Sequence, residues 1–363
     1  MNALSFFSGA GGLDIGFHKA GFNIKLCVEL NPKFCQTVLA NYPNWNVKCG
    51  DIMLYDKKRV LKEANVENGE TIDLIFGGSP CQSFSTAGNR QAFDDPRGKV
   101  MLKYADLIED LQPKVFLLEN VRGLLSAALM HRKIKYRGEG FPPLSEEEKP
   151  GSALQYLLSR FKSYSVQYKL INAANYGVPQ KRERVFIVGI RKDLGLKFNF
   201  PKETHSKKGG NGKDKWNTIS EVFERLRPIE KHNYVSYSKE RLKYMKMIPK
   251  GGGNWRDLPE NVAREAMGGA YSSTGGRVGF FRRVKALEPS PTLLTSPHQK
   301  STNLGHPYED RPLSIEEYLE IQGFPQGYKV IGTLIDQYTQ IGNAVPVQLA
   351  YVIGNAIKKT LES

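Results

Sequence analysis

Residues 74–85 read Leu-Ile-Phe-Gly-Gly-Ser-Pro-Cys-Gln-Ser-Phe-Ser, an apolar run that passes directly into a turn rich in Gly, Ser and Pro. A short β-prone run that ends at such a turn predicts a buried strand followed by a tight loop. The turn places Cys81 at the end of that strand, where a nucleophile would be held still. Cysteine is also among the most buried residue types, and a lone Cys81 is more often a small core hydrophobe. The rest of the chain must decide between these two interpretations.

The composition describes a soluble, basic chain. It has 363 residues, 52 Lys and Arg against 37 Asp and Glu, and a formal net charge of +15. This length suits one large domain plus a smaller one, with enough residues to bury a core. The positive excess favours a polyanionic partner, of which nucleic acid is the commonest.

Cysteines and histidines are few. The four cysteines, Cys27, Cys35, Cys49 and Cys81, form no Cys-x-x-Cys pair, and the six histidines include no His-x-x-x-His. We therefore expect no structural metal and no disulfide. The first residues do not resemble an export signal, and no apolar run reaches the roughly twenty residues that span a bilayer. We expect no membrane association and a cytoplasmic location.

Short apolar runs alternate with amphipathic stretches along the first half of the chain. An order of strand, helix, strand favours a parallel sheet with helices on both faces, which is a doubly wound α/β architecture. The predicted strands are 4–7, 24–28, 74–76, 115–118, 165–170 and 185–190, and the predicted helices are 33–40, 99–110 and 153–161.

Two regions interrupt this order. Residues 133–151 are charged and contain Gly and Pro, which predicts a mobile surface insertion. From about residue 201 to 309, lysine-rich Gly/Asn segments replace the periodic runs, which predicts a separate, irregular, basic module. Periodicity returns at 313–321 and in a helix that begins after Pro346.

The first predicted strand runs into a glycine-rich turn and a helix start at residues 6–17, Phe-Phe-Ser-Gly-Ala-Gly-Gly-Leu-Asp-Ile-Gly-Phe. Such a turn lets a ligand approach the backbone, and Glu29 at the end of the second strand suits two ribose hydroxyls. Asp51, near a third strand end, suits an adenine amino group. A nicotinamide dinucleotide is an alternative, but Asp14 would set a carboxylate beside its pyrophosphate, and two anions repel. The cationic sulfonium of S-adenosylmethionine meets no such objection, so we favour that cofactor.

Charged residues stand at two further strand ends. Glu119 lies at the tip of the strand that starts at Val115, and ligands bind at the carboxyl edge of α/β sheets. Arg182 and Arg184 alternate at the start of a later strand, so both side chains point to one face. Each has an ordinary alternative, a loop acid for Glu119 and a solvated edge for the arginines. Together the three are harder to explain in that way.

Five segments now occur in a fixed order: Phe7–Gly12, Pro80–Gln82, Glu119–Val121, Gln180–Arg184 and Gln340–Pro346. In this order they resemble the cytosine-5 DNA methyltransferases of bacterial restriction-modification systems, over the whole chain except the basic module. The resemblance implies a Rossmann-like, S-adenosylmethionine-dependent methyltransferase sheet with a second, smaller, irregular target-recognition domain.

A sixth family segment, at 311–325, departs from the pattern, because Glu320 stands where arginine is usual. That segment organises the recognition domain in the family, so the change concerns local packing more than activity.

The resemblance also implies boundaries and a binding set. Residues 1–195 would form the catalytic and cofactor-binding domain, 196–310 the target-recognition domain, and 311–363 a segment that returns to the catalytic domain. The residues assigned to S-adenosylmethionine are Phe7, Gly9, Gly11, Gly12, Glu29, Asp51, Ile52, Pro80, Asn343 and Val345.

The implied reaction gives roles to four catalytic residues. Carbon 5 of cytosine is a poor nucleophile until a group adds to carbon 6, and Cys81 as a thiolate would form that covalent adduct. Glu119, carrying or sharing a proton, would hydrogen-bond ring nitrogen 3. By resemblance, Arg184 contacts the cytosine carbonyl oxygen and Arg182 lies beside it. No side chain stands out as the base that removes the carbon 5 proton, and we expect ordered water to do so.

The partner implied is double-stranded DNA, at a sequence that the chain does not reveal. A stacked base cannot present carbon 6 to a thiol and carbon 5 to a sulfonium at once, so the cytosine must be flipped out. The lysines at 207, 208, 213 and 215 suit phosphates. The other expected DNA contacts are Ser83 and Ser85, in a loop that closes over the flipped base, and Arg277, Arg282 and Arg283 in the basic module.

We expect a monomer, and a cognate restriction endonuclease that acts on the same site without a stable complex. Two alternatives stay open. One is a tRNA cytosine-5 methyltransferase of the same fold, against which the long basic insert favours duplex DNA. The other is a catalytically inactive DNA-binding relative, against which the intact Cys81, Glu119 and arginines favour turnover.

Overall fold

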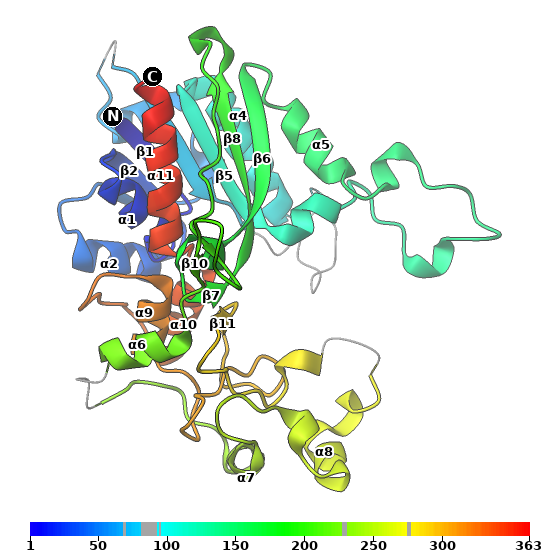
Figure 1. Cartoon of the computed structure of the whole chain (residues 1–363). Coiled ribbons are helices and arrows are strands. Elements are labelled where there is room, and N and C mark those ends of the chain that lie inside the picture. Colours follow the sequence, from blue (N-terminus) through cyan, green and yellow to red (C-terminus); the bar gives the residue numbers. More distant parts are fainter. Residues whose placement is uncertain (68–69, 81–92, 94–95, 227–230, 274–276) are drawn as a thin grey trace. The chain divides into compact units, whose positions relative to one another are not determined.

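The computed structural model describes residues 1–363 except 68–69, 81–92, 94–95, 227–230 and 274–276 (Figure 1). The chain divides into two compact units. The first unit is Met1–Ile171, Glu183–Lys202 and Ala350–Ser363, and the second is Asn172–Arg182 and Glu203–Leu349. These boundaries differ from those expected, because 172–182 and 311–349 belong to the second unit.

A seven-stranded sheet forms the first unit, in the order β3-β2-β1-β4-β5-β8-β6 (Figure 1). The neighbouring pairs from β3 to β5 are parallel, whereas β8 runs antiparallel to β5. The strands are β1 (Asn2–Phe6), β2 (Asn23–Glu29), β3 (Val47–Cys49), β4 (Leu74–Gly78), β5 (Val115–Val121), β6 (Tyr164–Asn172) and β8 (Glu183–Arg191).

The prediction of a parallel sheet is therefore right for five strands and wrong at β8. Only residues 173–182 join β6 to β8. Two parallel neighbours need a crossover of a dozen or more residues, usually a helix, and this connection is too short to supply one. The chain returns in the opposite direction instead.

Helices connect the parallel strands, and the three helices predicted in the first half are confirmed within three residues at each end. The six helices described for this unit, of which the last begins in the second unit, are α1 (Gly12–Lys19), α2 (Pro32–Asn41), α3 (Lys57–Glu63), α4 (Pro96–Leu111), α5 (Ser152–Ser159) and α11 (Val347–Leu361).

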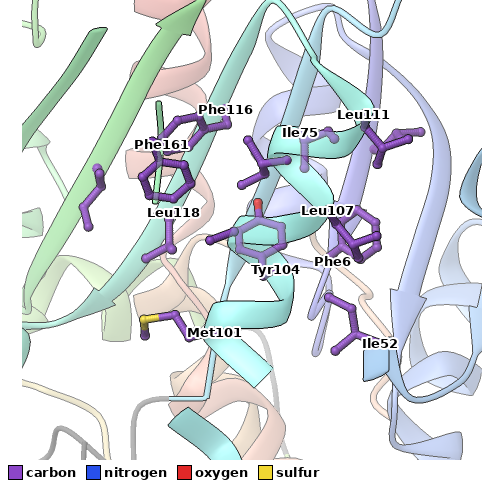
Figure 2. Close-up of a cluster of buried hydrophobic side chains, with 14 of the residues drawn as sticks. Phe6, Ile52, Ile75, Met101, Tyr104, Leu107, Leu111, Phe116, Leu118 and Phe161 are labelled. Atoms are coloured by element: carbon purple, nitrogen blue, oxygen red, sulfur yellow. The ribbon is translucent and has the colours of Figure 1, made fainter. Parts of the chain in front are cut away.

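The core lies between the sheet and α4 (Figure 2). Met101, Tyr104, Leu107 and Leu111 recur at helical spacing, so they form one apolar face of α4, and all four are buried. The phenol of Tyr104 donates to the carbonyl of Leu117 at 3.0 Å, which satisfies its only buried polar atom. The helix face that the sequence pattern predicts is thus the face that packs on the sheet.

Hydrogen bonds and an ion pair hold the insertion at 133–151 together, although the sequence predicted a mobile segment. They centre on Arg132, the residue directly before the insertion. The guanidinium of Arg132 donates to the carbonyls of Pro142 and Pro143 and pairs with Glu148 at 2.5 Å. Glu148 in turn accepts from the backbone N–H of Ser145 at 2.9 Å. The half-buried guanidinium of Arg132 therefore joins two parts of the insertion.

The second unit has the irregular texture that the sequence predicts. Each of its described strands has only two residues, and its helices are short. They are β7 (Gln180–Lys181), β9 (His205–Ser206), β10 (Asp214–Lys215), β11 (Ser290–Pro291), α6 (Ile219–Leu226), α7 (Lys239–Met247), α8 (Glu260–Met267), α9 (Ile315–Gln322) and α10 (Leu334–Asn343).

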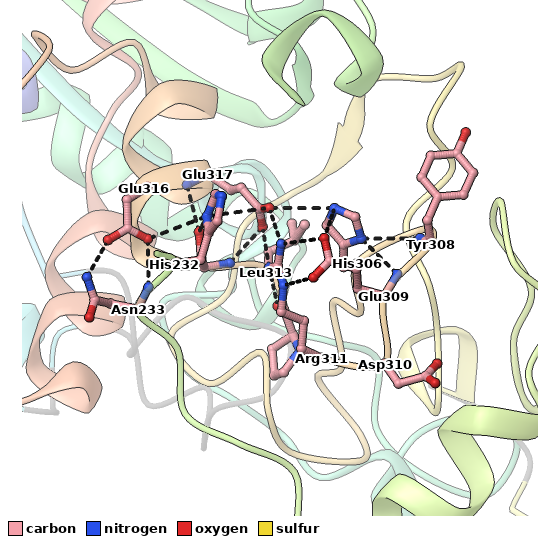
Figure 3. A network of polar contacts seen from close by, with 12 residues as sticks. His232, Asn233, His306, Tyr308, Glu309, Asp310, Arg311, Leu313, Glu316 and Glu317 are labelled. Atoms are coloured by element: carbon pink, nitrogen blue, oxygen red, sulfur yellow. Dashed lines mark hydrogen bonds and ion pairs between the residues drawn. The ribbon is translucent and has the colours of Figure 1, made fainter. Parts of the chain in front are cut away.

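A polar network stabilises this unit where α9 begins (Figure 3). Arg311 makes two hydrogen bonds to the carboxylate of Glu317, at 2.8 and 3.0 Å, and another to Glu309 at 2.8 Å. Glu317 also accepts from the backbone N–H of Ser314, whose hydroxyl caps the helix. Glu320, the residue that departs from the family pattern, pairs instead with Arg225 of α6. Its charge is therefore matched within this unit.

His306 is the titratable member of this network. Its Nδ1 accepts from the backbone N–H groups of Tyr308 and Glu309, at 3.2 and 2.9 Å, which requires a neutral ring. Its Nε2 lies 3.6 Å from Glu317 and 3.7 Å from Glu309. Burial outweighs these carboxylates and lowers the pKa of His306 to about 4.

Among the described residues, no helix is long and apolar enough to cross a membrane.

Acidification should destabilise the protein through His306. The unfolded ring has a pKa near 6.5, so below that pH the unfolded state binds a proton that the folded state refuses. Between pH 7 and pH 5 this costs about 2 kcal/mol of unfolding free energy. We expect urea unfolding to show that loss for the native protein and to show a smaller one for His306→Asn, whose amide oxygen still accepts. An equal pH dependence in both proteins would contradict this.

Gly189→Ala should destabilise the sheet. Gly189 of β8 faces Phe116 of β5, and a Cβ there would lie 2.0 Å from the phenyl ring. Phe116 cannot retreat, because it stacks on Phe161 at 4.2 Å. We expect a loss of about 1–3 kcal/mol in urea unfolding. Gly269→Ala, where nothing lies within 4 Å of the new Cβ, is the matched control.

Candidate active site

The turn after β1 has the backbone geometry that its glycines allow. Gly9 and Gly11 adopt φ values of 56° and 81°, a left-handed region that glycine enters without steric cost. Phe7 is also left-handed, with φ 61°, and is held there by its N–H, which donates to the carbonyl of Val28 at 2.8 Å. Gly12 begins α1. The turn therefore presents backbone at the carboxyl edge of the sheet.

Glu29 ties this turn to the end of β2. One carboxylate oxygen accepts from the N–H of Gly9 at 2.9 Å and the other from the N–H of Asn31 at 2.8 Å. Burial raises the pKa of Glu29, and these N–H bonds partly oppose the rise. A carboxylate can accept about four hydrogen bonds, so Glu29 keeps the capacity to accept one from a ligand hydroxyl. The structure thus brings together Gly9 and Glu29, as the sequence analysis requires of a ribose site.

Asp51 follows the end of β3, the neighbour of β2. Its carboxylate caps a short 3-10 turn, Ile52–Leu54, by accepting from the N–H of Met53 at 2.9 Å. Ile52 begins that turn and its side chain is buried in the core, and its contact with the cofactor stays a prediction.

Leu30 is a residue that the sequence analysis missed. It follows Glu29 directly and is 66% exposed, which is unusual for an apolar residue at a ligand-binding edge. An apolar side chain beside the Glu29 carboxylate offers a surface on which a planar group can pack. The signal available in the sequence was an isolated leucine directly after the acidic strand end.

Asp14 corrects one step of the sequence analysis. Its side chain is fully buried, and one oxygen accepts from the thiol of Cys27 at 3.3 Å. Burial raises the pKa of Asp14, while hydrogen bonds from Ser5, Cys27 and Ser8 oppose the rise. The carboxylate is therefore buried beneath the turn, where Ser8 hydrogen-bonds it, and is not exposed to a ligand. Asp14 is thus not exposed beside a bound phosphate, as the sequence had suggested.

Glu119 and Arg184 meet at the end of β5. Arg184 Nε lies 2.9 Å from Glu119 Oε1, and both side chains are largely buried. Arg184 stands opposite Val121 in the antiparallel register, so it reaches Glu119 as a diagonal neighbour on the same face. The structure thus confirms that these two residues, 65 positions apart in sequence, are close together.

Gly78 makes room for this pair. It is the register partner of Glu119 in β4, and a Cβ on Gly78 would lie 2.7 Å from Glu119 Oε2. The carboxylate therefore occupies the space that any larger residue would fill.

Asn120 fixes the chain that leads to Cys81. Its side-chain amide donates to the carbonyl and the hydroxyl of Ser79, at 3.3 and 3.2 Å. Pro80 is the last described residue before the gap. Cys81 itself, like Ser83 and Ser85, lies outside the described residues. What the structure shows is that the strand leading to Cys81 ends beside Glu119.

Arg182 makes hydrogen bonds within the second unit. It is fully buried, and its guanidinium donates to the carbonyls of Gly342 and Asn343 at 3.0 Å each. These contacts hold the end of α10 and make Arg182 a positioning residue, in place of the stabilising group beside the cytosine that we expected. Of the two expected cofactor contacts in the second unit, Asn343 is exposed and Val345 is buried.

The three arginines expected to contact DNA differ in their surroundings. Arg277 lies over the ring of Trp255 at 5.3 Å and donates to a backbone carbonyl. Arg282 is largely buried, which lowers its pKa, and its Nε has no partner among the described residues. Arg283 is 1% exposed and donates to the carbonyls of Met245, Ile248, His306 and Glu309. Arg283 is thus a structural residue, and its expected DNA contact is wrong.

The strand order, with one antiparallel strand beside β5, is typical of methyltransferases. The sequence model of the family described as C-5 cytosine-specific DNA methylase matches residues 1–359. The chain belongs to this family and is a DNA cytosine-5 methyltransferase of type II restriction-modification systems, which confirms the resemblance inferred from its motifs. Family membership implies dependence on S-adenosylmethionine and a DNA substrate.

Individual relatives agree with the family match. The chain is 37% identical to the type II methyltransferase M.Sau96I of Staphylococcus aureus, over 98% of this chain and 75% of that protein. It is 35% identical to M.NgoPII of Neisseria gonorrhoeae, over 100% and 96%. A prophage-encoded E. coli protein, assigned as a DNA modification methyltransferase, shares the fold with a TM-score of 0.68, 24% identity and full coverage of both chains.

Gly78→Ala should impair methylation. The new methyl group would displace the Glu119 carboxylate and disturb its pair with Arg184. A displacement of this size at a reacting group costs roughly tenfold to a hundredfold in rate. Incorporation of tritiated methyl groups into DNA measures the effect, with Gly269→Ala as control. A rate equal to that of the native protein would show that the carboxylate position is unimportant.

Proposed function

We propose that this methyltransferase transfers a methyl group to carbon 5 of a flipped cytosine within a specific double-stranded DNA sequence, through a covalent adduct between Cys81 and carbon 6. The observation that carries this proposal is the pair between Glu119 and Arg184, at 2.9 Å, next to the strand that leads into Cys81. An acid and a guanidinium side by side complement the polar edge of cytosine, which has a ring nitrogen beside a carbonyl oxygen.

Glu119 and Arg184 each contact one polar atom at that edge of the cytosine. Arg184 donates to the carbonyl oxygen, where negative charge develops during attack at carbon 6. Glu119 shares a proton with ring nitrogen 3 and so neutralises the ring as the thiolate adds. The largely buried position of both groups strengthens each interaction, because little water competes.

Cys81 supplies the nucleophile. A free thiol has a pKa of about 8.5 and is a few per cent ionised near neutrality, which suffices for addition to an activated ring. The hydrogen bonds from Asn120 to Ser79 fix the chain two residues before the thiol. After transfer, the carbon 5 proton leaves to water and the Cys81 sulfur is expelled, which restores aromaticity.

The residues at the sheet edge fit S-adenosylmethionine as the methyl donor. Glu29 has free lone pairs for the ribose hydroxyls, Asp51 suits the adenine amino group, and the exposed Leu30 offers an apolar face to the base. The turn of Phe7, Gly9, Gly11 and Gly12 provides backbone that a ligand can approach. When bound, this group supplies a methyl on a cationic sulfonium. We keep Pro80, Asn343 and Val345 as further contacts.

We assign target recognition to residues 196–310, with 1–195 and 311–363 serving catalysis and cofactor binding. Arg277 and Arg282 remain candidates for DNA contacts, together with the lysines at 207, 208, 213 and 215 for phosphates and Ser83 and Ser85 for the closing loop. We propose that the enzyme acts as a cytoplasmic monomer, and that a cognate endonuclease cuts the same site without a stable complex. The family match favours DNA over tRNA as substrate.

Cys81→Ser should abolish methyl transfer and leave S-adenosylmethionine binding within about twofold, because a hydroxyl does not ionise near neutrality while the cofactor residues are unchanged. Tritium incorporation into DNA and into tRNA measures the first effect, and calorimetry the second. Cys49→Ser, a change at an exposed cysteine assayed in reductant, is the matched control and should stay active. Substantial turnover by Cys81→Ser would refute the assignment. Bisulfite sequencing of plasmid from expressing cells would identify the target sequence.

A further inference from the structure

Two cysteines flank the backbone of Glu29. Cys35 lies in the first turn of α2, and its thiol donates to the carbonyl of Glu29 at 3.4 Å. Cys49 ends β3, is the register partner of Glu29, and donates to the carbonyl of Leu30 at 3.5 Å. The two thiols also interact with each other. Both sulfurs therefore lie against the strand end whose carboxylate we assign to the ribose.

The two thiols differ in access. Cys49 is exposed, whereas Cys35 is 5% exposed. Burial, together with the neighbouring Cys49 and Glu29, raises the pKa of Cys35, so this sulfur stays protonated. An oxidant in solution therefore reacts with Cys49 first. Cys35 is the second thiol, which reacts with the oxidised Cys49.

Cys27 does not compete for this reaction. It is fully buried in β2, and its thiol donates to Asp14. Burial, together with the charge of Asp14, raises the pKa of Cys27 well above its usual range. The thiol pair that a solvent-borne oxidant can reach, among the cysteines that the structure describes, is thus Cys35 with Cys49.

We infer that a hydroperoxide converts Cys35 and Cys49 into a disulfide, and that this bond weakens cofactor binding at Glu29 and Asp51. The Cys49 thiol gives up its proton, and its sulfur takes one oxygen from hydrogen peroxide and becomes a sulfenic acid, while the other peroxide oxygen leaves with that proton as water. The Cys35 sulfur then attacks the Cys49 sulfur, and the hydroxyl leaves with the Cys35 proton as a second water. Two thiols are oxidised and one peroxide is reduced. The binding half of the inference rests on the proposed function.

The bond acts on the binding site through backbone. It removes the S–H donors from the Glu29 and Leu30 carbonyls and draws the first turn of α2 towards the end of β3. Asn31, whose N–H holds the Glu29 carboxylate, caps that turn. Gly50, whose N–H donates to the Glu29 carbonyl, follows Cys49 and precedes Asp51. Loss of one charge-assisted hydrogen bond to the ligand corresponds to roughly tenfold in affinity.

The test uses the full chain with Cys81→Ser, so that the nucleophile cannot react and binding is read without activity. Hydrogen peroxide is added, remaining thiols are alkylated, and trypsin digestion follows. Cleavage after lysines 25, 33, 48 and 57 puts the three cysteines of this region on separate peptides, 26–33, 34–48 and 49–57. We expect peptide 34–48 linked to 49–57. Absence of that link, or a link through 26–33, would overturn the inference.

Calorimetry with S-adenosylmethionine then compares the reduced and oxidised proteins. We expect oxidation to weaken binding about tenfold and dithiothreitol to restore it. The matched variant, Cys49→Ser with Cys81→Ser, should bind equally before and after peroxide. If the linked protein binds as tightly as the reduced one, the inference fails while the proposed function stands. If the reduced protein does not bind, it is the proposed cofactor site that fails, and the binding half of the inference fails with it.

Discussion

The antiparallel pairing of β8 with β5 is the constraint on which the site depends. Glu119 lies at the carboxyl end of β5, and Arg184 lies at the amino end of β8. In a parallel pair these two ends would stand at opposite edges of the sheet, a strand length apart. Only the reversal brings the guanidinium to 2.9 Å from the carboxylate. The short connection after β6 therefore affects the site as well as the topology. It sets the direction of β8, the strand that carries Arg184.

A glycine and an amide side chain then fix the positions of the Glu119 carboxylate and of the turn before Cys81. Gly78 leaves the space that the Glu119 carboxylate fills, and Asn120 secures the turn that precedes Cys81. Gly78 lies on β4 and Asn120 on the neighbouring β5, so the strand that leads to Cys81 ends beside the strand that carries Glu119. One edge of the sheet therefore holds the groups to which we assign the contacts with the cytosine. The same edge carries Glu29 at the end of β2, two strands from β4, and Asp51 after β3, three strands from β4, so the residues that we assign to the methyl donor belong to the same sheet.

Part of the positive charge of this protein is structural. Arg182 and Arg283 are buried and bind backbone carbonyls, so they contribute to the formal charge without being available to DNA. The irregular second unit has few backbone ladders, and a guanidinium with five donors can satisfy carbonyls that no strand pairs. Basic residues in such a unit are thus partly structural. Arg311, held between Glu309 and Glu317, belongs to the same group.

The sequence by itself determined six strands of the main sheet, the helices at 33–40, 99–110 and 153–161, the ordered motifs and the family, because those signals are local: an apolar run, a glycine turn, a helical period, a strand-end acid. No range was predicted for the short strand β3, and the short helices α3, α6, α7 and α8 were not predicted. Long-range contacts decided the rest. The direction of β8 depends on a connection whose path no local pattern states. The burial of Asp14 and Arg283, and the meeting of Cys35 with Cys49, depend on which elements pack together. A charged residue in a motif looks the same in sequence whether it faces a ligand or the core, and only the packing around it tells the two apart.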